Sequence, residues 1–223
     1  KASSILNYMI PKHVFNRDVS TDDIVSRGNY QAVFSNRSSF PTYRYQPTPP
    51  NRIGQFTFEY GPVLTRHDID DFGSVDFVAD PFLWSDGQEK WHMFFEVYNE
   101  DRDPDAAIGH ATSTGLLDWE YNQIVLEIDL HVSFPYVFKW NDEHYMLPER
   151  VDQKAVLFKA KHFPSDWEQI CVPVDHHSVT NDAVIFRWEG KWWIAVNSTF
   201  EGENLYLYHS EELKASDWVP HEL

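Results

Sequence analysis

The sequence is poor in features that would stabilise a small secreted scaffold or span a membrane. Among its 223 residues Cys171 is the single cysteine, so no intrachain disulfide can form, and we expect Cys171 in the core rather than as a nucleophile. No run of about 18 apolar residues occurs, which argues against a membrane-spanning helix. The apolar run within Lys1 to Pro11 is too short for a secretion signal, although a signal could have been removed beforehand. We therefore expect a soluble, cytoplasmic protein.

Positive charge is also scarce. The chain has 18 Lys and Arg against 35 Asp and Glu, a formal net charge of -17, which would repel nucleic-acid phosphates and anionic membrane surfaces. This excludes nucleic acid as an expected partner. The acidic balance fits either an ordinary acidic soluble protein or a protein adapted to high salt, and the sequence leaves both open.

Several chemical motifs are missing as well. No Gly-rich phosphate loop is present, and no Ser or Cys lies in a nucleophile-elbow context. The 11 histidines show no zinc-ligand spacing, and adjacent His176 and His177 would point to opposite faces of a strand. We expect no cofactor and no metal.

Aromatic residues are abundant: 9 Trp, 11 Tyr and 16 Phe favour strands over helices. From Val75 onward three segments can be aligned, so that Pro81, Pro135 and Ala183 occupy one position of the repeat at intervals of about fifty residues. Each has a short apolar run, a polar hairpin turn, a second run and a third run. The second runs end at Glu96, Glu149 and Asn197, and the segments close on Asp118-Trp119, Asp166-Trp167 and Asp217-Trp218.

Four short strands in a unit of about fifty residues are typical of a β-propeller blade. The sequence therefore predicts an all-β propeller with three clear blades, and a β-sandwich is the alternative. We assign residues 51–223 to the blades and residues 1–50 to an N-terminal arm or partial blade whose span Pro41 to Pro50 is proline-rich. That span is a linker or an extended arm. Either residues 1–74 hold a further blade, or this chain is cut from a longer protein.

The first strand of each blade in a propeller lines the central channel, so residues that begin these strands converge on one funnel. Asp80, Phe134 and Asp182 occupy the same position at the opening of the three segments, which we call the opening slot. Two carboxylates from different blades in one funnel are what acid–base cleavage of a glycosidic bond requires. A glycoside hydrolase is therefore one hypothesis.

The opening Ala79-Asp80-Pro81 resembles the His-Asp-Pro or Asn-Asp-Pro opening of the five-bladed arabinanase, β-xylosidase, levansucrase and invertase-like glycosidases. This resemblance implies a five-bladed β-propeller with Asp80 as base or nucleophile. Asp182 lies at the place of the third-blade acid, which is a Glu in the arabinanase-like members. Phe134 replaces the second-blade Asp of those enzymes, which favours saccharide binding without hydrolysis.

Roughly residues 75–220 bear a closer resemblance, carried by Ala79-Asp80-Pro81-Phe82-Leu83, Met93-Phe94-Phe95-Glu96, His131-Val132-Ser133-Phe134-Pro135-Tyr136-Val137-Phe138 and Tyr145-Met146-Leu147-Pro148-Glu149. These runs are similar to the N-terminal propeller of glucosamine inositolphosphorylceramide transferases and their prokaryotic relatives. The resemblance implies a saccharide or glycan partner and a fused or neighbouring transferase domain. The second hypothesis is therefore a non-catalytic carbohydrate-recognition propeller.

The candidate residues follow from the equivalent positions. The candidate catalytic set is Asp80, Asp182 and Glu149; the candidate substrate-binding set is Glu96, His131, Arg150, Asn181 and Asn197. For Glu96 and Glu149 the alternative is a solvated strand end or a hydrogen bond to the neighbouring blade. In the functional interpretation the Arg150 cation lowers the pKa of the Glu149 carboxyl. His131 either reaches the funnel or has a structural role.

Overall fold

The computed structural model describes residues 39–41, 44–46, 55–57, 62–85, 87, 90–116, 118–175, 181–198 and 204–221. Within these ranges the fold is all-β, and the helical residues form a single 3-10 turn, Arg66–Asp68. The strand-like run Tyr30-Gln31-Ala32-Val33-Phe34 of the sequence lies outside the described residues. The division at residue 50 stays a prediction.

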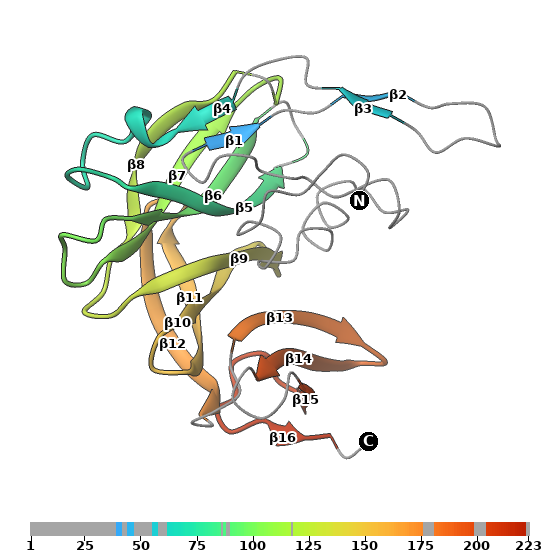
Figure 1. The fold of residues 1–223 in the computed structure, drawn as a ribbon. Helices are drawn as coiled ribbons and strands as arrows, with labels where there is room; N and C mark the ends of the chain where they lie inside the picture. The colour runs from blue at the N-terminus through green and yellow to red at the C-terminus, as the bar shows by residue number, and fades with distance from the viewer. Residues whose placement is uncertain are drawn as a thin grey trace.

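Three four-stranded antiparallel sheets follow one another along the chain and fan out around a common side (Figure 1). Blade 1 contains β5 (Phe77–Ser85), β6 (Trp91–Tyr98), β7 (Ala106–Ser113) and β8 (Glu120–Leu126). Blade 2 contains β9 (Val132–Trp140), β10 (Glu143–Arg150), β11 (Lys154–His162) and β12 (Asp166–Asp175). Blade 3 contains β13 (Asn181–Trp188), β14 (Lys191–Ser198), β15 (Asn204–Ser210) and β16 (Val219–Pro220). In each blade the strands pair in chain order, which is the predicted propeller blade.

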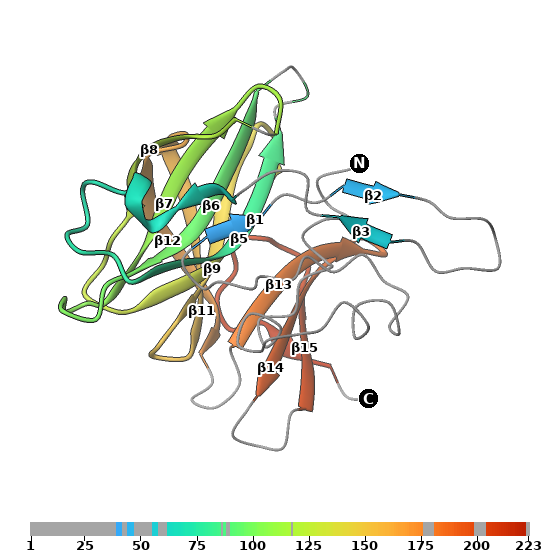
Figure 2. The same cartoon turned by 45° about the horizontal axis from the view of Figure 1, so that its top comes forward.

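The first strands of successive blades contact one another, β5 against β9 and β9 against β13. The sandwich alternative is therefore wrong, because its strands would divide between two facing sheets. Before blade 1, β1 (Ser39–Pro41) pairs with β4 (Pro62–Thr65), and β2 (Arg44–Gln46) pairs with β3 (Gln55–Thr57). The β2–β3 pair lies apart from the blades (Figure 2). The five-blade count stays a prediction.

The hairpin turns have the backbone that their sequences predict. Asn141 and Asp142 between β9 and β10 have φ of 49° and 62°, and Glu189 and Gly190 between β13 and β14 have φ of 47° and 83°. Two successive left-handed residues are the requirement of a type I′ turn, whose twist matches that of the flanking strands.

The closing Asp-Trp pairs make the same hydrogen bond in every blade. The indole Nε1 donates to the carbonyl three residues earlier: Trp119 to Leu116 at 2.9 Å, Trp167 to Pro164 at 2.8 Å and Trp218 to Ala215 at 2.9 Å. Trp167 and Trp218 are buried in the core. A buried indole N–H needs an acceptor, so this tight turn lets each tryptophan pack against its blade.

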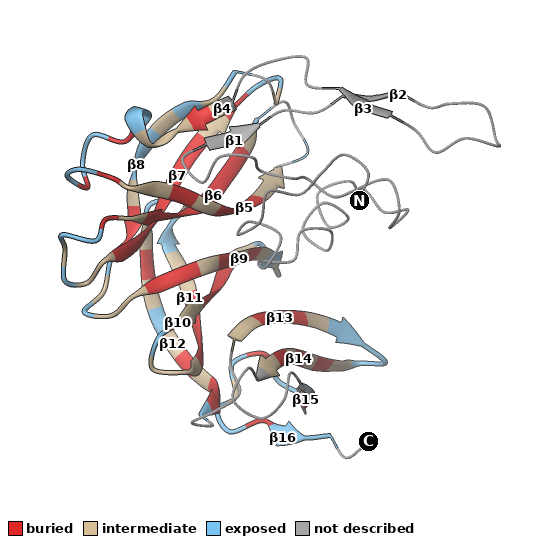
Figure 3. Ribbon diagram, in the orientation of Figure 1, coloured by how far each residue is buried: buried red, intermediate tan, exposed pale blue. Residues whose placement is uncertain are grey.

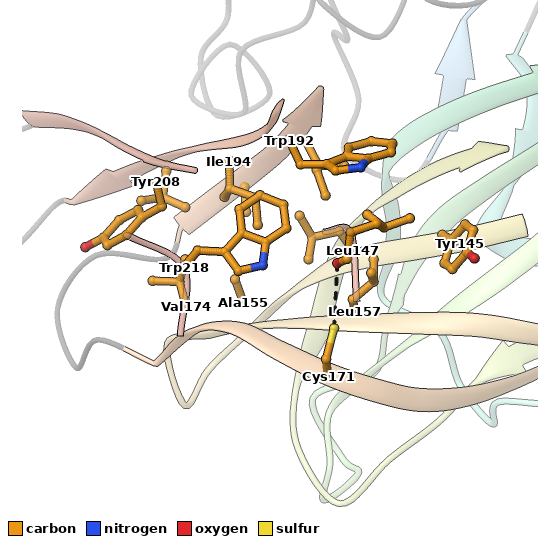
Figure 4. Packing of buried hydrophobic residues seen from close by; sticks show 14 residues of the cluster. Tyr145, Leu147, Ala155, Leu157, Cys171, Val174, Trp192, Ile194, Tyr208 and Trp218 are labelled. Carbon is orange, nitrogen blue, oxygen red and sulfur yellow. Dashed lines mark hydrogen bonds between the residues drawn. The ribbon is translucent and has the colours of Figure 1, made fainter. Parts of the chain in front are cut away.

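The core consists of separate layers, and in blade 1 the middle strands β6 and β7 hold most of the buried residues (Figure 3). One cluster joins blade 1 to β4, a second joins blades 1 and 2, and a third joins blades 2 and 3 (Figure 4). Cys171 is buried in the third cluster, where desolvation raises the pKa of its thiol to about 11. This confirms its placement in the core.

Tryptophans at the ends of the inner strands pack between blades. Trp84 meets His144 of blade 2 edge to face at 4.7 Å between ring centroids, and Trp140 meets Trp192 of blade 3 at 5.1 Å. Trp188, which occupies the position of Trp140 in blade 3, is 63 % exposed. Trp84 and Trp140 are therefore inter-blade packing residues. In the described part of the chain, no helix has the length and apolar character to span a membrane.

Candidate functional site

The three opening slots share one backbone conformation. Asp80, Phe134 and Asp182 have positive φ of 47°, 49° and 49°. Left-handed backbone is rare outside glycine, and Asp tolerates it better than Phe. The same uncommon conformation in three blades confirms that these residues are structurally equivalent, although their side chains differ.

Each slot is the protruding part of a β-bulge. Ala79 pairs with Glu96 and Ser133 with Glu149, and in both blades the register shifts over the next two residues. Blade 3 has the same shift after Asn181, which pairs with Asn197. Bulges bend a strand and redirect its side chains, and they are frequent next to binding sites. The bulge therefore sets the direction of the slot side chain at the funnel end of its blade.

The slot side chains have different environments. Asp80 is buried, with 4 % of its surface exposed, and Asp182 is half-buried. The ring of Phe134 packs edge to face on Phe82 of blade 1 at 4.7 Å between centroids. The middle slot therefore contributes an aromatic ring to the joint with blade 1. The two flanking slots hold carboxylates instead.

Glu149 connects blade 2 to the opening of blade 3. Its Oε2 accepts a hydrogen bond from the backbone N–H of Asp182 at 3.1 Å. A carboxylate that accepts from a backbone N–H makes a charge-assisted bond. This is the hydrogen bond to the neighbouring blade that the sequence left as an alternative, and it places Glu149 directly beside a candidate catalytic residue.

Glu96 has the corresponding role between blades 1 and 2. Its Oε1 lies 3.5 Å from Nε2 of His131, the residue before β9, and Nδ1 of His131 lies 2.8 Å from Oδ1 of Asp105. Glu96 is buried, whereas His131 and Asp105 are partly exposed. A histidine between two carboxylates thus links the end of β6, the loop after it and the entrance to β9.

Arg150 pairs with Asp152, and its expected effect on the pKa of Glu149 stays a prediction. Its Nε and Nη2 donate to the two oxygens of Asp152 at 3.0 and 2.7 Å. This is the bidentate geometry in which a guanidinium and a carboxylate form their strongest pair. Arg150 therefore fixes the turn between β10 and β11, close to Glu149.

A pocket of about 530 Å³ opens beside these residues and spans blades 1 and 2. It is lined by Glu100, Arg102 to Asp105, Asp129 to His131, Glu149 and Val151. Two predicted residues, His131 and Glu149, thus face one pocket. Carboxylate oxygens accept hydrogen bonds from hydroxyl groups, and an aliphatic wall suits the apolar face of an organic ligand.

Sequence reasoning missed Asp105 and Asp152, the partners of His131 and Arg150. Both lie in turns, where acidic residues are common for conformational reasons, so their type carried no signal. Within the described ranges, no group of three or more His, Cys, Asp or Glu residues has the arrangement of a metal site.

The comparisons with known proteins agree with this fold and layout. A sequence model of the family described as glucosamine inositolphosphorylceramide transferase 1, N-terminal, matches residues 59–222. The chain belongs to this family. Glucosamine inositolphosphorylceramide transferase 1 of Oryza sativa subsp. indica is 33 % identical over 136 residues, which are 60 % of this chain and 18 % of the relative. The protein of the same name from Arabidopsis thaliana is 30 % identical over 172 residues, 72 % of this chain and 21 % of the relative.

The chain thus matches only about a fifth of the length of these family members. Among solved structures, an exo-β-1,3-galactanase from Phanerochaete chrysosporium superposes with a TM-score of 0.61 at 13 % identity, covering 83 % of this chain and 44 % of the enzyme. Other similar structures are glycoside hydrolases of families 43 and 32. The family's N-terminal domain therefore has the propeller fold of these glycosidases, as the sequence resemblance implied.

Proposed function

We propose that the chain is a carbohydrate-recognition propeller that binds a saccharide at the funnel end of its blades and works beside a transferase domain. The observation that carries the proposal is the set of three equivalent bulges, which present Asp80, Phe134 and Asp182. Carboxylates accept hydrogen bonds from sugar hydroxyls, and an aromatic ring suits the apolar face of a pyranose.

Recognition is favoured over hydrolysis by the middle slot. Phe134 holds an aromatic ring there, packed on Phe82. The glycosidases that the opening motif resembles have an Asp at this position, which orients the sugar and tunes the acid. The link between Glu149 and the Asp182 N–H gives Glu149 a part in shaping the binding end of blade 3. The relatives are named as transferases, and most of their length lies outside the match, which fits a partner transferase domain.

A glycan array tests this proposal. Binding of one class of saccharide is expected for the wild type, with affinity retained in Asp80→Asn and reduced at least tenfold, about 1.4 kcal/mol, in Glu149→Gln. Glu168→Gln, which alters an exposed carboxylate of β12, is the matched control and should bind as the wild type does. An array on which the folded wild type binds no saccharide would contradict the proposal.

Glycoside hydrolysis is the second candidate, because Asp80 and Asp182 occupy equivalent positions in different blades. In that case Asp80 is the base or nucleophile and Asp182 or Glu149 is the acid. Hydrolysis of aryl glycosides and oligosaccharides that the wild type performs and Asp80→Asn does not would favour this candidate. Equal background rates for the two proteins would eliminate it.

A further inference from the structure

Three histidines lie together at the joint between blades 1 and 2. His92 on β6 and His110 on β7 are 7 % and 2 % exposed, and Nδ1 of His92 lies 2.9 Å from Nε2 of His110. His144 on β10 stacks on Phe163 of the β11–β12 turn, with ring centroids 3.9 Å apart. The ring of His92 also meets Phe163, at 4.9 Å. Phe163 thus joins histidines from both blades.

The hydrogen bond between His92 and His110 excludes protonation of both rings at once. One proton suffices for the bond between His92 and His110, because a donor on one ring faces an acceptor on the other. If both rings were protonated, two N–H groups would face each other. Among the described residues, Nδ1 of His110 and Nε2 of His144 have no hydrogen-bond partner, so an added proton there would have no acceptor.

Within the described residues, no negatively charged side chain acts on His110 or His144 to balance protonation. The ionisable groups that act on these two rings are His92 on β6, Lys90 before β6 and Lys139 on β9, and all of them oppose a positive charge. The other packed side chains are the aromatic rings of Trp84, Phe94, Phe163 and Trp167. Glu143, adjacent to His144 in the chain, pairs instead with Lys159 and Lys214.

We propose that this histidine cluster makes the joint between blades 1 and 2 acid-sensitive, so that protonation of His110 and His144 loosens the packing of the two blades. The pocket described above is also walled by residues of these two blades, although none of the three histidines lines it. The proposal concerns the fold itself and does not depend on the saccharide-binding proposal.

Burial of His110 and His144 also disfavours the protonated form of both rings. Burial first, and the nearby cations second, lower the pKa of His110 to about 3 and that of His144 to about 4, from an ordinary 6.5. The unfolded chain therefore binds protons more readily than the folded one below pH 6.5. The contribution of the neutral rings is fully present above pH 6.5 and is lost as the pH falls towards 4 and 3.

Acid unfolding tests this, followed by tryptophan fluorescence and near-UV circular dichroism from pH 7 to pH 3. His144→Phe removes one proton site while Phe still packs on Phe163, and its unfolding midpoint should fall by about half a pH unit or more. His162→Phe is the matched control: this histidine is exposed on the same blade beside Asp166, and no downward shift is expected. Equal midpoints for wild type and His144→Phe, or an equal downward shift in His162→Phe, would overturn the proposal.

Imidazole titration of the wild type by NMR gives a second readout that needs no variant. His110 and His144 should remain neutral at every pH where the protein is folded and should gain their protons together with unfolding. If either ring titrates in the folded protein near pH 6.5, the proposal is wrong.

Discussion

Gly109 lies in the middle of β7, where the neighbouring strand leaves no room for a side chain. A Cβ at this position would come within 2.8 Å of the Phe95 ring and of the Val97 side chain. Phe95 and Val97 are fully buried and belong to the cluster that joins blade 1 to β4. The absence of a side chain at Gly109 therefore lets β6 and β7 pack closely in the core of blade 1.

Substituting Gly109→Ala should destabilise the protein by about 1–3 kcal/mol, because the close-packed core must shift to admit the methyl group. Urea unfolding at neutral pH measures this difference. Gly115→Ala is the control, since a Cβ there meets nothing within 4 Å, and it should leave the midpoint nearly unchanged. If the two variants have the same stability, the packing around Gly109 is not as described.

Sequence reasoning at the residue scale found the slot positions but not their conformation. Asp80, Phe134 and Asp182 differ in chemistry, so no residue type signals a left-handed bulge there. The pairing of Arg150 with Asp152 was missed because two residues of separation across a turn are not a recognisable ion-pair spacing. Side-chain partners depend on backbone turns that local sequence specifies weakly.

At the scale of the element, the strand pattern was predictable from β5 to β16, because apolar runs and turn residues alternate regularly there. Before the blades, the alternating run Ile53 to Tyr60 predicts one strand, and β3 (Gln55–Thr57) lies within it. β1 and β2 were not predictable, because each contains three residues, too few for a periodic signal. The histidine cluster also escaped notice, because its members come from β6, β7 and β10.

The inter-blade tryptophans give a prediction that compares equivalent positions. Trp140 packs on Trp192, and the Arg187 guanidinium lies 5.0 Å from its ring centroid. Trp140→Ala should therefore destabilise the protein by about 2–3 kcal/mol through lost aromatic and cation contacts. Thermal or urea unfolding provides the measurement.

Trp188→Ala is the matched control for that substitution. The Trp188 side chain is 63 % exposed, and the hydrogen bond that it receives from Trp193 ends on its backbone oxygen, which alanine retains. Its effect should stay within about 0.5 kcal/mol. A loss as large as that of Trp140→Ala would mean that the two positions are not distinguished by inter-blade packing.

At the scale of the whole molecule, the blades repeat a fold shared with glycosidases. Two of the three opening slots depart from the pattern that the sequence resembles, because Phe134 replaces an Asp and Asp182 stands where the arabinanase-like members have a Glu. Phe134 stands between Asp80 and Asp182, and Glu96 and Glu149 each contact the entrance of the following blade. Glu96 and Glu149 thus link neighbouring blades, and Glu149 also lines the pocket. This double role of Glu149 fits the proposed saccharide recognition.

The most direct test of the account is hydrogen–deuterium exchange of the free protein and of the protein saturated with the saccharide that binds most tightly on the array. We predict slower exchange at the three bulges and their approaches, residues 77–82, 131–136 and 181–184, because the ligand would contact the funnel end of all three blades. Protection confined to the outer strands β8 and β12, with exchange at the bulges unchanged, would contradict the account.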